Sequence, residues 1–65
     1  MVEVNLNTFL RNKALVRFFV DFRFVDVIDN KAVEVNAKSG DEVVVSYTSA
    51  KILEEYGIAK IIKVV

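Results

Sequence analysis

Few side chains in this chain could do chemistry. There are nine acidic and nine basic residues but no histidine and no cysteine. A hydrolase or transferase needs a nucleophile with a base, or paired carboxylates that converge in a pocket, and histidine is the usual base near neutral pH. The ordinary ligand sets for zinc, haem and iron–sulfur clusters are also missing. We therefore expect a protein that is not an enzyme and that carries no cofactor.

Three carboxylates lie close together in the sequence, and carboxylate clusters are what hard metal ions prefer. They are Asp21, Asp26 and Asp29. The simpler interpretation is that Asp21 is a solvated strand residue and Asp29 a turn former. The two glycines, Gly40 and Gly57, lack the neighbouring residues that an EF-hand or a phosphate-binding loop requires at fixed positions. No metal site is predicted.

A cationic and aromatic platform for nucleic acid is a second option. Arg17, Phe19 and Arg23 would project from one strand face if the strand is continuous. Asp21 lies between the two arginines on that face and offsets half of their charge, and the whole chain has zero formal net charge. Contact with nucleic acid is therefore not favoured, and a protein partner fits this face better.

Apolar residues on the same nominally outer face give the third option. Phe19, Val25 and Val27 fall there, and the alternation slips around Phe24. Two interpretations stay open: a β-bulge brings Val25 or Val27 inward, or these side chains form an exposed apolar strip for docking on another protein. The candidate partner-docking residues are Arg17, Phe19, Arg23, Val25 and Val27.

One long strand is expected to position these residues. Apolar side chains recur at every second position over 15–28, which predicts a half-buried core strand. Turn residues at 29–31 and 38–41 separate two further alternating runs, 32–37 and 42–47, and this favours an antiparallel meander. The residues expected on the buried face of the core strand are Val16, Phe18, Val20, Phe22 and Phe24.

A short helix and a last strand complete the predicted order. Thr48 or Ser49 can cap a helix over 50–56, and Gly57 suits its left-handed end. Because two turns are marginal in water, we expect the apolar residues of this helix to pack on the sheet. The fold class is therefore mainly β, a small α+β fold: an antiparallel meander of about four to five strands with one short helix near the C-terminus. The helix residues expected to pack on the sheet are Ile52, Leu53 and Tyr56.

The size of the chain indicates a single domain over 1–65, with residues 1–13 forming either a linker or an edge strand. Its hydrophobic content of 54% is high for a globular domain, which favours a partner. The sequence shows no signal peptide and no apolar run of about 20 residues, so we expect an intracellular protein, without contact to a membrane.

Short motifs over residues 14–62 resemble the small β domain (B domain) of GINS complex subunits, most closely the archaeal ones. In the first half they are Val16-Arg17 leading to Asp21, and Phe24-Val25 before a turn with Asp29. In the second half they are Gly40-Asp41 before a valine-rich strand, Ser49-Ala50-Lys51-Ile52-Leu53, and Gly57-Ile58-Ala59 with Ile62. The resemblance implies a tethered, non-catalytic docking module of a DNA replication scaffold. The implied partners are other GINS subunits, the MCM helicase and a RecJ-like protein, with primase or polymerase as a further candidate. The implied compartment is the archaeal cytoplasm or, in a eukaryote, the nucleus.

Three alternatives stay open beside this one. The chain could be the related C-terminal domain of an archaeal primase catalytic subunit, or a free-standing small nucleic-acid-binding β domain. It could also be a homo-oligomeric structural protein that pairs through residues 1–7 or 60–65. The isolated domain is expected to be a monomer.

Overall fold

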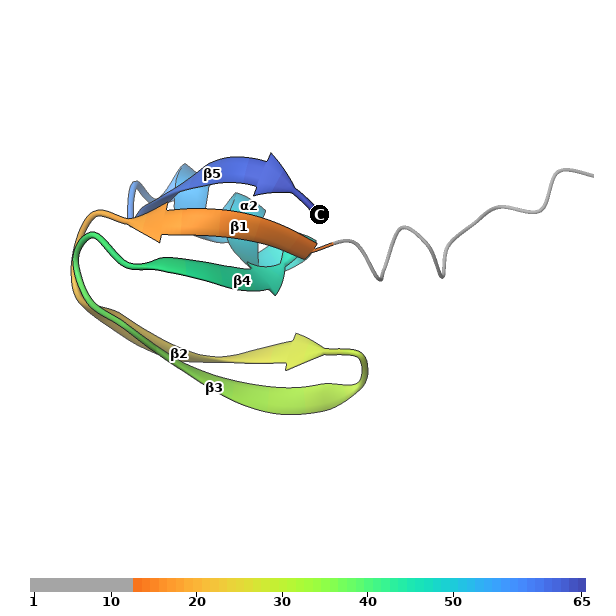
Figure 1. The fold of residues 1–65 in the computed structure, drawn as a ribbon. Helices are drawn as coiled ribbons and strands as arrows, with labels where there is room; N and C mark the ends of the chain where they lie inside the picture. The colour runs from red at the N-terminus through yellow and green to blue at the C-terminus, as the bar shows by residue number, and fades with distance from the viewer. Residues whose placement is uncertain (1–12) are drawn as a thin grey trace, which may run out of the picture.

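A computed structural model describes residues 13–65 of the chain (Figure 1). Predictions for residues 1–12, including the edge strand or linker, lie outside the described residues. The elements are β1 (Lys13–Phe18), β2 (Phe22–Ile28), β3 (Lys31–Ala37), β4 (Glu42–Ser46), α2 (Tyr47–Glu55) and β5 (Ala59–Val64).

The strands form two antiparallel sheets. One has the order β4-β1-β5, and the other is the two-stranded ribbon β2-β3. In the first sheet, Val16 lies opposite Val43 on one side and Ile61 on the other. The register between β1 and β5 shifts between Leu15 and Val16, so β5 has one extra residue there. The mainly β class, the five strands and the short helix toward the C-terminus are confirmed.

The ribbon is a hairpin closed by a two-residue turn. Ile28 pairs with Lys31, and Asp29 and Asn30 have φ angles of 53° and 65°. Two successive positive φ angles are the signature of a type I′ turn, whose twist suits a tight hairpin. Asp and Asn tolerate this conformation better than most residues do. The turn predicted at 29–31 is therefore confirmed, with Lys31 already in β3.

The prediction of one continuous strand over 15–28 is wrong, because the chain leaves the first sheet after Phe18. The backbone N–H of Phe18 donates to Asp41 O, and that of Phe19 donates to Ile58 O, each at 2.9 Å. Residues 19–21 then carry the chain across to the ribbon. Val20 lies in this connection and is 48% exposed, so its expected place in the core is also wrong.

The turn at 38–41 is present, but it does not join two paired strands. Gly40 adopts a φ of 92°, which an L-residue rarely takes, and its N–H donates to Phe18 O at 2.7 Å. This bond ties the turn to the end of β1, and β4 then pairs with β1 instead of β3. The predicted meander therefore holds only for β2 and β3.

The helix begins earlier than its sequence suggested. Ser46 is the N-cap, and its hydroxyl accepts a 3.2 Å hydrogen bond from Ser49 N, whereas Thr48 or Ser49 was expected to cap. Gly57, with a φ of 72°, ends the helix as predicted. Leu53 is buried, but the expected packing of Ile52 and Tyr56 is wrong, since both are exposed. Ala50, three residues before Leu53 on the same helix face, is buried instead.

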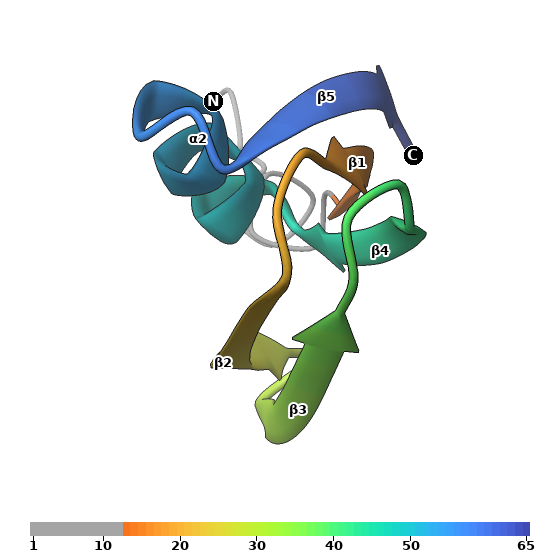
Figure 2. The ribbon, with the colours of Figure 1, turned by 90° about the vertical axis from the view of Figure 1, so that its left-hand side faces the viewer.

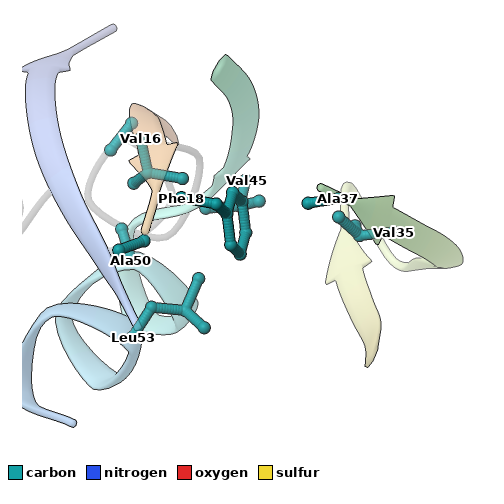
Figure 3. Close-up of a cluster of buried hydrophobic side chains, with 9 residues drawn as sticks. Val16, Phe18, Val35, Ala37, Val45, Ala50 and Leu53 are labelled. Carbon is teal, nitrogen blue, oxygen red and sulfur yellow. The ribbon is translucent and has the colours of Figure 1, made fainter. Parts of the chain in front are cut away.

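The core lies where α2, the ribbon and one face of the three-stranded sheet meet. Figure 2 shows α2 on one side of this sheet and the ribbon below it. In Figure 3, Phe18 stands between the helix and the ribbon. The described residues include no helix that is long and apolar enough to cross a membrane. The buried apolar residues form one cluster: Ala14, Val16, Phe18, Val35, Ala37, Val45, Ala50, Leu53 and Ala59.

Candidate docking surface

The side of the ribbon that faces away from the core carries two exposed valines. Val25 and Val27 are 64% and 63% exposed. The pairing of β2 with β3 keeps one register from Phe22 to Ile28, so there is no bulge to turn either valine inward. Of the two interpretations of these residues, the bulge is wrong. We call this surface the outer ribbon face, and its residues are Arg23, Val25 and Val27 on β2 with Ala32, Glu34 and Asn36 on β3.

The opposite face of β2 explains why this alternation is fixed. Phe22 and Phe24 pack against the core, and their ring centroids lie 5.7 Å apart. Asp26 follows at the next inward position and is 3% exposed. A shift of one residue would expose both rings and bury Val25 and Val27, so burial of the inner face determines what the outer face presents.

Charge on the outer ribbon face is balanced. Arg23 and Glu34 are exposed, on different strands and beside the valine pair. Neither forms an ion pair with another described residue. The face therefore presents an apolar centre with one cation and one anion near it, as in the polar rim of a protein interface.

Two of the five candidate docking residues lie elsewhere. Arg17 belongs to the three-stranded sheet, where its Nε donates to Glu42 Oε2 at 3.0 Å and its Nη2 forms an ion pair with the same oxygen. Phe19 is 51% exposed, in the connection between β1 and β2. The platform of Arg17, Phe19 and Arg23 on one strand face is therefore not formed, and Glu42 satisfies one of its two cations.

A buried carboxylate connects the ribbon to the start of the helix. Asp26 Oδ2 accepts from Ser46 N at 2.7 Å, and Oδ1 accepts from the hydroxyls of Ser46 and Ser49 at 2.8 and 2.6 Å. Oδ1 also accepts from Val27 N at 2.9 Å. The charge lies at the helix N-terminus, where the helix dipole favours an anion. Both carboxylate oxygens are occupied by protein donors, so the network ties the ribbon to the start of the helix.

The ionisation of Asp26 follows from these bonds. Burial by itself raises the pKa of this carboxyl, since desolvation penalises the charged form. Hydrogen bonds from Ser46, Ser49 and Val27 favour the charged form and hold the pKa below its usual 3.8. Asp26 is therefore ionised at neutral pH.

The three aspartates do not converge. Asp21 Oδ1 accepts from Ser39 N at 2.8 Å, and Asp29 forms an ion pair with Lys13 at 3.4 Å. Asp26 is buried in its own network. Over residues 13–65, no group of three or more His, Cys, Asp or Glu residues is arranged to hold a metal ion.

Asp26 is the residue whose importance sequence reasoning missed. It occupies an inward position of the alternation set by Phe22 and Phe24, and a carboxylate at such a position requires buried donors. That pattern was a usable signal. The donors themselves, Ser46 and Ser49, lie 20 and 23 residues away and could not be assigned from the sequence.

Comparison with models of protein families, with curated protein sequences and with solved structures finds no match for this chain.

Proposed function

We propose that this chain is a non-catalytic docking module that binds another protein through the outer ribbon face. The observation that carries the proposal is the pair Val25 and Val27, which are exposed side by side on a strand of fixed register. A partner that covers them would gain roughly 1–2 kcal/mol from each side chain. The ribbon is held from behind by buried residues, so it can bind with little reordering.

The resemblance to the small β domain of GINS subunits suggests the setting for this proposal. In that setting the module is part of a DNA replication scaffold, and it links the MCM helicase to a RecJ-like protein or to primase or polymerase. A domain on a tether raises the local concentration of its partner, so modest contacts are sufficient. The balanced charge of the outer ribbon face supports a protein partner over nucleic acid.

The test is capture of MCM and of a RecJ-like protein by the immobilised full chain. Three forms of the chain are compared: the wild type, a double variant of the outer ribbon face, and a control variant. Val25→Thr with Val27→Thr keeps the β-branched shape but makes the strip polar, and it is expected to weaken binding at least tenfold. Val64→Thr changes an exposed strand valine in β5 and is expected to bind like the wild type. Thermal unfolding should be nearly the same for all three, since both sites are exposed.

Two results would count against the proposal. Equal capture by the wild type and the double variant would show that the outer ribbon face is not the contact. If the chain captures neither protein, even with the other GINS subunits present, the hypothesis that it works in a DNA replication scaffold would be rejected.

A further inference from the structure

A second surface lies on the three-stranded sheet, on the face turned away from the core. The register across β5, β1 and β4 places Lys60, Arg17 and Glu42 in one row. The row two residues earlier on β1 holds Lys63, Leu15 and Val44. No described helix or strand covers this face, because α2 and the ribbon both pack on the other side (Figure 2). We call these six residues the outer sheet face.

Positive charge on the outer sheet face is not balanced. Glu42 supplies its only carboxylate, which is bound to Arg17. Lys60 lies directly across the ladder from Arg17, and like charges in such a pair repel each other. Within residues 13–65, neither Lys60 nor Lys63 has an ion-pair partner. An anion bound beside Lys60 and Lys63 would reduce the repulsion between Lys60 and Arg17 and would neutralise the two unpaired lysines.

The centre of the face is aliphatic. Leu15 is half-buried and Val44 is 43% exposed, and the two are directly paired. None of the six residues is aromatic, so no ring is present on which a nucleic-acid base could stack. Two unpaired lysines also release few counterions, which makes binding to a phosphate backbone weak. The face therefore fits a ligand with both apolar groups and carboxylates better than it fits nucleic acid.

From this pattern we infer that the outer sheet face binds an acidic amphipathic helix of a partner protein. Its aliphatic stripe would lie over Leu15 and Val44, and its carboxylates would lie beside Lys60 and Lys63. The two rows are about 6.5–7 Å apart, as for strand residues two positions apart. Carboxylates four residues apart on a helix are separated by about 6 Å along its axis, which matches this spacing. This surface is separate from the outer ribbon face, so a chain with both could join two partners.

The test uses the full chain and a synthetic helix of about 16 residues, with a leucine stripe bordered by glutamates. A second peptide has glutamine in place of every glutamate. Anisotropy titrations are expected to show binding of the glutamate peptide, at least tenfold weaker binding of the glutamine peptide, and further loss at high salt.

Charge-reversal variants locate the contact. Lys60→Glu with Lys63→Glu is expected to weaken binding of the glutamate peptide at least tenfold. Lys38→Glu with Lys51→Glu makes the same change in net charge, in a turn and in α2, and is expected to bind like the wild type. Lys60→Glu with Lys63→Glu is expected to fold normally, because the new carboxylate at position 60 lies opposite Arg17. Its unfolding temperature should therefore be no lower than that of the wild type.

Several outcomes would overturn the inference. One is absence of binding by the glutamate peptide at low salt, and another is equal binding of the two peptides. A third is binding of a thymidine oligonucleotide that Lys60→Glu with Lys63→Glu abolishes, while the glutamate peptide does not bind. All three leave the outer ribbon face untouched, so they can be distinguished from a failure of the proposed docking function.

Discussion

Phe18→Ala is expected to lower the free energy of unfolding by about 3–5 kcal/mol, as large-to-small changes in a packed core do. Phe18 is one of the largest fully buried side chains, and it lies between the helix and the ribbon (Figure 3). A domain of 65 residues has a total stability of roughly 3–10 kcal/mol. The variant is therefore expected to be largely unfolded or close to it.

Urea denaturation followed by circular dichroism measures this effect, with Phe18→Leu as the control. Leucine keeps most of the apolar volume, so the loss should be about 1–2 kcal/mol. A cost of less than about 1 kcal/mol for Phe18→Ala would show that Phe18 is not closely packed between the helix and the ribbon.

Asp26→Ala is expected to cost about 2–4 kcal/mol, since it leaves partly buried donors without an acceptor. The donors are the backbone N–H groups of Ser46 and Val27 and the hydroxyls of Ser46 and Ser49. For a domain this small, the unfolding temperature should fall by roughly 4–8 °C per kcal/mol. Thermal unfolding at neutral pH measures this change. A fall of only one or two degrees would show that the network contributes little.

Asp26 also predicts how stability depends on pH. Its pKa in the folded protein lies below the usual 3.8, so the unfolded chain takes up the proton first as the pH falls. The stability that Asp26 contributes is fully present above about pH 4 to 5 and is lost as the pH falls through the folded pKa. In Asp26→Asn this part of the acid-induced loss should be absent, while the other carboxyls still contribute theirs. The measurement is a series of denaturation curves from pH 6 to pH 2 for the wild type and for Asp26→Asn. Equal loss of unfolding free energy in the two proteins over this range would contradict the prediction.

Local patterns predicted the elements well but not their partners. The alternation of apolar and polar residues correctly predicted that Val16, Phe18, Phe22 and Phe24 face the core. Turn-forming residues correctly marked the turns at 29–31 and 38–41. The strand nevertheless ends after Phe18, where the backbone N–H groups of Phe18 and Phe19 donate to Asp41 O and Ile58 O. Such bonds link distant segments, and no periodicity within 15–28 could reveal them.

The helix shows a similar limit. Its existence and its glycine end were predicted, but its start was placed late because Ser46 resembled the end of a strand. A buried carboxylate from the ribbon fixes Ser46 as the cap. Ala50 and Leu53, three residues apart, share the buried face of the helix, while Tyr56 follows the helix as its C-cap and is exposed.

The candidate site was only partly predictable. Val25 and Val27 were among the expected docking residues, and the continuous register of the hairpin excludes the β-bulge and leaves both side chains exposed. A continuous strand would put Arg17 on the same face as Arg23, but Arg17 lies in β1 and Arg23 in β2, which belong to different sheets. The outer sheet face depends on the pairing of β1 with β4 and β5, three segments that are far apart in the sequence, so no local pattern contained it.

Thiol labelling of Val25→Cys measures directly whether a partner covers the outer ribbon face, since the chain has no native cysteine. The introduced thiol is expected to react in the free protein almost as fast as in an unfolded peptide, and at least tenfold more slowly in complex with MCM or a RecJ-like protein. Val64→Cys, exposed in β5, should label at the same rate in both states. Slow labelling of Val25→Cys in the free protein would show that Val25 is not exposed. An unchanged labelling rate once a partner is bound would show that the partner does not cover the outer ribbon face.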